Sequence, residues 1–481
     1  MAERSQQQLF RHGGLYAAST LGSAALSLLI LPVYVSVLGK RGLGQVDVLQ
    51  AGTSALTLTI AQGLPAAFFR MRFEYQEAER RAFESIVSAY IVLSGLAAVA
   101  LGLLLGPWLA RWLTPEIDFY PLWLLSIAIA ATNVLGDVYA TGLQAEARSG
   151  QFVVFTLGRR ALMLGLIVLL VVQARWGVLG KVAGEALAAT TIALCVLFWL
   201  RPHWSRLQLR EARPLLRAAL AYGWPLLPHA LAMQVVAVSD RFVLNHYLGL
   251  SAVGVYALGY RIASVLESVT GGLANAYRAL FMASAADASQ DRAQQDARLA
   301  DLELKLLAAV SFGAHALSIA TRDVLALVHI DLLAFAEAWQ VSYIVCWGLL
   351  AHAAYAVLAA PLFYAQHATS RVAGISMAAA AVNLVGCLLF VPRVGLHAAA
   401  WATAASHICL AAGAYVLGRR VWTLPRSLPS WSMLFAWHSL VLALGWQVDV
   451  HLDTWPQRIA AKAVLVLLSA LVCTRTLFRK N

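Results

Sequence analysis

Hydroxyl, amide, aromatic and charged side chains recur along several apolar stretches of this sequence at the spacing of one helix face. The first stretch, 13–38, carries Tyr16, Thr20, Ser23, Ser27 and Tyr34 at this spacing, and the second, 43–69, carries Asp47, Gln50, Ser54 and Thr57. Residues three or four apart share one side of an α-helix, so each set predicts a polar stripe on an apolar helix. These groups can bind a polar molecule through hydrogen bonds.

Two later stretches repeat this pattern. Residues 219–246 place His229, Met233, Val236 and Asp240 on one face and Gln234, Arg241 and Asn245 on the adjacent face, and residues 251–277 place Tyr256, Tyr260, Ser264 and Glu267 on one face. Polar groups in hydrocarbon are costly, so they face a bundle interior or a wet cavity. Four stripes favour a central hydrophilic cavity. The alternative is that they only hold helices together by hydrogen bonds.

The charged members of these stripes suggest two kinds of chemistry. An arginine fork is suited to grip phosphate, which makes Arg241 and Arg261 candidate anion ligands. A buried carboxylate can carry a proton, and the candidates for ion coupling are Asp240, Glu267, Asp47 and Asp137. Asp240 and Arg241 are adjacent and about 100° apart on a helix, so we expect that they do not simply neutralise each other. For Arg159 and Arg160 we expect snorkelling to the cytoplasmic surface.

Catalytic and cofactor motifs are not found in the sequence. It has no Walker A lysine loop, GxSxG elbow, HExxH pair or dinucleotide glycine fingerprint. The five cysteines lie in apolar stretches without CxxC spacing. We therefore expect no enzyme, no catalytic residues, no metal site and no cofactor.

Composition determines the class of protein that must position these stripes. Of 481 residues, 60% are hydrophobic and 12% charged, against about 25% charged in soluble domains. The mean hydropathy is +0.71. These values exclude a soluble enzyme domain, a disordered chain and a secreted disulfide scaffold, and predict an all-α polytopic membrane protein.

A membrane-spanning helix needs about 20 apolar residues. Fourteen stretches qualify: 13–38, 43–69, 85–110, 119–141, 153–173, 182–200, 219–246, 251–277, 302–321, 339–364, 372–391, 396–418, 431–447 and 460–476. The amino terminus, the even-numbered loops and the carboxyl terminus hold 21 Lys and Arg residues, and the odd-numbered loops hold 8. The positive-inside rule then places both termini in the cytoplasm. The net charge of +12 is mostly a feature of that face, where it attracts anionic membrane lipids, and nucleic acid is not an expected partner.

An internal repeat divides the chain. At a shift of 210 residues, the segment 38–44 (LGKRGLG) falls on 248–254 (LGLSAVG), and a fainter match at a shift of 218 places Gly177 on Gly395. Six spans separate the copies, which predicts a parallel repeat of two six-helix bundles. The expected domains are a first bundle (1–200), a cytoplasmic basic linker (201–218), a second bundle (219–418) and two additional transmembrane helices (419–481).

Three segments carry a resemblance to a known family: 31–50 (LPVYVSVLGKRGLGQVDVLQ), 222–266 and 391–407. With them, the chain resembles polysaccharide-biosynthesis flippases of the Wzx type, in the multidrug/oligosaccharidyl-lipid/polysaccharide exporter superfamily. The resemblance implies two six-helix bundles around a central cavity, with two extra helices. It also implies alternating access driven by a cation gradient.

The implied substrate is an oligosaccharide on undecaprenyl pyrophosphate, moved across the bacterial inner membrane for export of O-antigen, capsule or exopolysaccharide. A polysaccharide polymerase and a chain-length regulator are the implied protein partners. The expected cavity residues for sugar or pyrophosphate are Arg241, Arg261, Tyr256, Tyr260, Gln234, Asn245, Tyr16 and Gln50. The alternatives are a multidrug or cation antiporter, a lipid II flippase and, from another class, a membrane polysaccharide polymerase or ligase.

Overall fold

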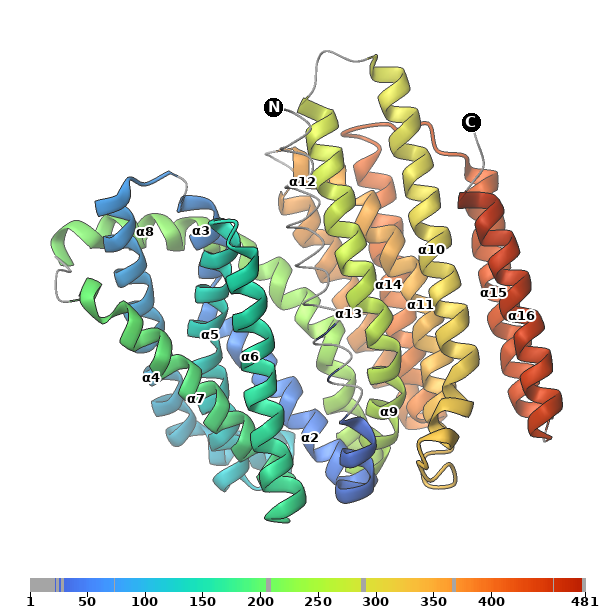
Figure 1. Cartoon of the computed structure of the whole chain (residues 1–481), viewed down its shortest axis with the longest axis horizontal. Helices are drawn as coiled ribbons and strands as arrows, with labels where there is room; N and C mark the ends of the chain where they lie inside the picture. The colour runs from blue at the N-terminus through green and yellow to red at the C-terminus, as the bar shows by residue number, and fades with distance from the viewer. Residues whose placement is uncertain are drawn as a thin grey trace. The chain divides into compact units, whose positions relative to one another are not determined.

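The computed structural model describes residues 30–72, 74–204, 209–286, 291–365, 369–452 and 454–477, together with Gly22 and Leu26. In these residues all regular secondary structure is helical, which confirms the all-α class (Figure 1). Most of the predicted span 13–38, with Tyr16, lies outside the described residues.

Eleven helices in the described part of the chain are long and apolar enough to cross a membrane. They contain twelve of the fourteen predicted spans, because the longest helix contains two. The polytopic membrane class is therefore confirmed. The predicted span 43–69 corresponds to helices α2 (Leu31–Ala61) and α3 (Leu64–Met71), which are not among the eleven.

The chain divides into two compact units. The first comprises Met1–Gln234 with Gly249–Gly254. After α2 and α3 it contains α4 (Glu77–Leu113), α5 (Leu124–Ala145), α6 (Ser149–Val168), α7 (Gly177–Trp204) and α8 (Leu209–Gly223). α5 packs against α2, α4 and α7, and α7 packs against α6. α8 begins in the segment 201–218, which was expected to be a linker, and packs on α3 and α4.

The second unit comprises Val235–Leu248 with Val255–Asn481. Its helices are most of α9 (Leu227–Ala286), then α10 (Arg292–Leu327), α11 (Ala338–Leu358), α12 (Ala360–Tyr364), α13 (Thr369–Val394), α14 (Leu396–Gly418), α15 (Leu428–His451) and α16 (Trp455–Leu477). α14 packs against α11 and α13, while α10 packs against α11, α15 and α16. The last two helices are therefore held on α10.

Glycines break two of the helices at repeat-equivalent positions. Gly39 in α2 has φ 63° and ψ −176°, and Gly249 in α9 has φ 78° and ψ 172°. A side chain strongly disfavours this positive φ, so glycine is the residue for such a corner. Gly177 and Gly395, the other matched pair, also have positive φ values of 58° and 85° and directly precede or begin α7 and α14. The sequence repeat thus coincides with a repeat in backbone conformation.

Candidate functional site

A buried ion pair lies in the second unit, in the first segment of α9. The side chain of Asp240 is 0% exposed and that of Arg241 is 8% exposed. Nη1 of Arg241 donates to Oδ1 of Asp240 at 2.6 Å and to the carbonyl oxygen of Ala237 at 2.7 Å. The expectation that these neighbours do not neutralise each other was wrong. On the helix the two Cβ atoms point in different directions. The long side chain of Arg241 nevertheless folds back along its own helix and reaches the adjacent carboxylate.

Two tyrosines from the second segment of α9 complete this cluster. The hydroxyl of Tyr256 donates to Oδ2 of Asp240 at 2.5 Å. The guanidinium of Arg241 lies 4.1 Å from the ring centroid of Tyr260 and 5.3 Å from that of Tyr256, within the range of cation–π attraction. The structure therefore brings together four of the residues expected at the site.

Helices α13 and α14 extend the cluster through residues that the sequence analysis did not select. Oγ of Ser239 donates to Oδ1 of Asn383 at 2.9 Å, and Nδ2 of Asn383 donates to Oγ1 of Thr403 at 3.1 Å. Thr403 in turn lies 3.5 Å from Oδ2 of Asp240. The sequence did contain one sign that Asn383 could belong to the site, because it is the only amide side chain in the apolar run 372–391.

The first unit holds a second polar group between α2 and α7. Nζ of Lys181 donates to Oε1 of Gln50 at 3.2 Å and forms an ion pair with Glu185 at 2.5 Å. Nearby in the sequence, Ser54 accepts a hydrogen bond from Nε2 of Gln234 at 2.6 Å. Lys181 falls between the predicted spans 153–173 and 182–200, but it lies in the second turn of α7 and is 7% exposed. The spacing of four residues between Lys181 and Glu185 is the sequence feature that could have predicted this ion pair.

A third polar group joins α5 to α6. Arg159 donates from Nη1 to Oδ1 of Asp137 at 2.8 Å and from Nη2 to Oδ1 of Asn133 at 2.8 Å. The expected snorkelling was wrong for Arg159, because α6 begins at Ser149 and places the arginine well inside the helix. Its side chain reaches sideways to a carboxylate instead.

The remaining expected site residues are dispersed. Asn245 is 4% exposed, and its Oδ1 has no hydrogen-bond partner in the described structure. Asp47 is buried in α2, while Arg261 and Glu267 are half-buried on the second segment of α9. Tyr16 lies outside the described residues. In the described ranges, no group of three or more His, Cys, Asp or Glu side chains is placed to hold a metal ion.

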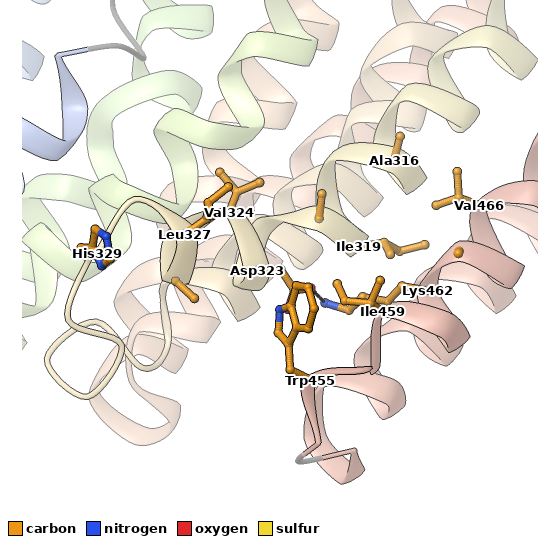
Figure 2. A pocket seen from close by; sticks show the side chains of 13 residues that line it. Ala316, Ile319, Asp323, Val324, Leu327, His329, Trp455, Ile459, Lys462 and Val466 are labelled. Carbon is orange, nitrogen blue, oxygen red and sulfur yellow. Dashed lines mark hydrogen bonds and ion pairs between the residues drawn. The ribbon is translucent and has the colours of Figure 1, made fainter. Parts of the chain in front are cut away.

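A charged cluster fastens α16 to α10 and α15 in the second unit. Nζ of Lys462 lies 2.5 Å from Oδ2 of Asp323 and 2.6 Å from Oδ1 of Asp449, and Arg458 pairs with Asp323 at 2.8 Å. Figure 2 shows Lys462 and Asp323 at the side of a pocket of about 700 Å³ between α10 and α16. Most of its lining is aliphatic, including Ile319 and Ile459, so it offers a surface for hydrocarbon rather than for sugar.

A further buried pair joins the segment before α15 to α10. Arg426 contacts Glu303 through Nε at 2.5 Å and Nη2 at 2.8 Å, and the hydroxyl of Tyr277 donates to the same carboxylate at 2.7 Å. Burial by itself lowers the pKa of Arg426, but the hydrogen bonds and the charge of Glu303 outweigh it and raise this pKa above its ordinary value. The arginine therefore stays charged.

Residues 9–277, more than half of the chain, match the model of a family described as polysaccharide biosynthesis protein. The chain belongs to this family. A search of curated protein sequences gave no match.

Solved structures of transporters share the fold. The lipid II flippase MurJ, in an inward closed conformation, has 14% sequence identity, a TM-score of 0.71 and coverage of 97% of this chain and 100% of its own. An inward-facing MATE multidrug resistance transporter of the MOP superfamily has 16% identity, a TM-score of 0.62 and coverage of 84% and 97%. A MOP superfamily transporter from Pyrococcus furiosus, described by the reverse polarity of its binding pocket, has 15% identity, a TM-score of 0.62 and coverage of 86% and 96%.

These findings establish the general nature of the protein. Its family is one of polysaccharide biosynthesis, its helices are those of a multi-pass membrane protein, and its fold is that of MOP superfamily transporters.

Proposed function

We propose that this protein moves oligosaccharide repeat units linked to undecaprenyl pyrophosphate across the bacterial inner membrane, for export of O-antigen, capsule or exopolysaccharide. A pyrophosphate and a hydroxyl-rich sugar do not cross about 30 Å of hydrocarbon unaided. The observation that supports the proposal is the set of charged and amide groups held inside membrane-spanning helices of a polysaccharide biosynthesis protein. The prenyl tail of the substrate stays in the lipid during transport.

The polar side chains have separate parts in this proposal. Amide and phenol groups bind sugar hydroxyls, and Asn245 is the best placed of them because its buried carbonyl oxygen has an unused acceptor. Gln50, Gln234, Tyr16, Tyr256 and Tyr260 are the other proposed sugar contacts. Arg241 and Arg261 attract the pyrophosphate.

Alternating access coupled to a cation gradient requires a group that binds the cation. We assign this part first to Asp240, because its carboxylate is buried and holds Arg241 by charge. Protonation of Asp240 removes the charge that holds the pair, and Arg241 is then available to the substrate. Glu267, Asp47 and Asp137 are the other proposed coupling sites.

Deletion of the gene tests the proposed function. We expect polysaccharide at the cell surface to be lost and lipid-linked repeat units to accumulate on the cytoplasmic leaflet. Units on the outer leaflet would instead indicate a defect in polymerisation or ligation. Normal polysaccharide with sensitivity to cationic drugs would indicate an antiporter, and a block in peptidoglycan synthesis with accumulated lipid II would indicate a lipid II flippase.

A further inference from the structure

Arg160 lies near the middle of a membrane span. The span runs from Ser149 to Gln173, and Arg160 is separated from its first residue by eleven positions. At 1.5 Å per residue this is about 16 Å, about half of the hydrocarbon thickness of a bilayer. A guanidinium at this depth is far from water at either surface and therefore needs a partner or a wet site inside the protein.

The described structure provides Arg160 with no carboxylate partner. Its one hydrogen bond is from Nη1 to the thioether sulfur of Met163 at 3.9 Å, and its side chain is half-buried. A thioether is only a weak acceptor. Most of the donor capacity of the planar fork is thus unused.

The charges near Arg160 are already engaged elsewhere. The charge of Glu185 attracts the guanidinium of Arg160, and the charge of Arg159 repels it. However, Glu185 forms an ion pair with Lys181. Arg159 forms an ion pair with Asp137. Among these five side chains, three cations therefore share two carboxylates. Arg160 is the one of these three cations for which the described structure shows no ion pair.

Arg241 differs from Arg160 in this respect. Its fork is used by Asp240 and by the carbonyl oxygen of Ala237, and its guanidinium is covered by the ring of Tyr260. A ligand anion must displace Asp240 to reach it. At Arg160 an anion replaces only a thioether.

We propose that Arg160 binds a phosphate oxygen of the anionic substrate within the first unit. This inference rests on the proposed function, and it names the residue that recognises the pyrophosphate before Arg241 is released. An arginine fork can hold two phosphate oxygens through parallel hydrogen bonds.

Binding of sugar-free undecaprenyl pyrophosphate to the purified full-length protein in detergent tests this site. We expect Arg160→Gln to weaken binding by about tenfold or more, because charge-assisted hydrogen bonds are lost. Arg160→Lys should recover only part of the affinity, since a lysine ammonium does not form the bidentate contact. The matched control is Arg475→Gln, at an exposed arginine in the last turn of α16, which should bind as the unmodified protein does.

Membrane abundance provides a second measurement. Arg160→Gln should insert at normal abundance, since it leaves no carboxylate without a partner. Arg159→Gln should be depleted, because it leaves Asp137 without its ion pair. Depletion of Arg160→Gln would show that the arginine is a packing residue and would overturn the site.

The binding results separate this inference from the proposed function. If the unmodified protein binds undecaprenyl pyrophosphate and Arg160→Gln binds it equally well, the site at Arg160 is wrong and the proposed function stands. If the unmodified protein binds none of this lipid, both are wrong.

Discussion

Gly44 and Gly254 occupy equivalent positions in two backbone contacts that mirror each other. A Cβ on Gly44 would lie 1.8 Å from the carbonyl oxygen of Leu250, and a Cβ on Gly254 would lie 1.8 Å from the carbonyl oxygen of Lys40. Both glycines are separated by 210 positions in the sequence, as are Lys40 and Leu250. All four residues belong to the first unit. The second segments of α2 and α9 start near these positions and approach each other closely there. This close approach explains why both copies of the repeat have a glycine here.

Alanine at either of these glycines should destabilise the protein. The added methyl group meets a backbone oxygen, which cannot move aside like a flexible side chain, so we expect a loss of at least about 1–3 kcal/mol. The measurement is membrane abundance together with thermal unfolding of the purified protein. Gly158→Ala is the matched control, because a Cβ there meets nothing within 4 Å. Equal stability of Gly44→Ala and Gly158→Ala would show that the close contact is absent.

The Asp240–Arg241 pair should respond differently to single and double substitution. Removing one partner of a buried ion pair leaves the other charge uncompensated and typically costs about 3–5 kcal/mol. We therefore expect Arg241→Gln and Asp240→Asn each to lower the thermal stability of the purified protein. The double variant should recover much of the loss. Additive losses would mean that the two side chains are not coupled.

Transport by these variants then tests the assigned roles. A stable double variant should still fail to restore polysaccharide export in a deletion strain, because both the proposed coupling carboxylate and the arginine are neutral. Full restoration of export would show that Asp240 and Arg241 stabilise the protein but have no role in transport.

The cluster around Lys462 should determine whether α16 stays on α10. Asp323→Asn removes a charge that faces both Arg458 and Lys462, so we expect loss of about 3–5 kcal/mol and release of the carboxyl-terminal helices to protease. Proteolysis of the purified protein and its unfolding temperature measure this. Asp301→Asn is the control, since its pair with Lys305 is one turn apart and partly exposed, and should cost at most about 0.5 kcal/mol. Equal effects of the two substitutions would contradict the anchoring role.

Both termini should face the cytoplasm. The distribution of 21 and 8 Lys and Arg residues between the two sets of loops and ends is the reason. A fusion of alkaline phosphatase after Asn481, an enzyme that is active only in the periplasm, should therefore be inactive, while a fusion in the segment 114–118 should be active. Activity at the carboxyl terminus would require an odd number of spans.

Local properties were enough to predict the helices and several of their breaks. Hydrophobic runs determine membrane spans, because the length of a helix must match the bilayer. Twelve of the predicted spans correspond to long apolar helices. The repeat-equivalent glycines Gly39 and Gly249 adopt nearly the same positive φ, which is a property of the residue itself.

The partners of charged side chains that lie far apart in the sequence were decided by tertiary structure. Periodicity placed Asp240 and Arg241 on different faces, but rotation about the arginine side chain brings them to 2.6 Å. Asp323 and Lys462 are separated by 139 positions in the sequence, and no local pattern relates them. A charge within hydrocarbon requires compensation, which the sequence shows, but which residue supplies it depends on how the helices pack.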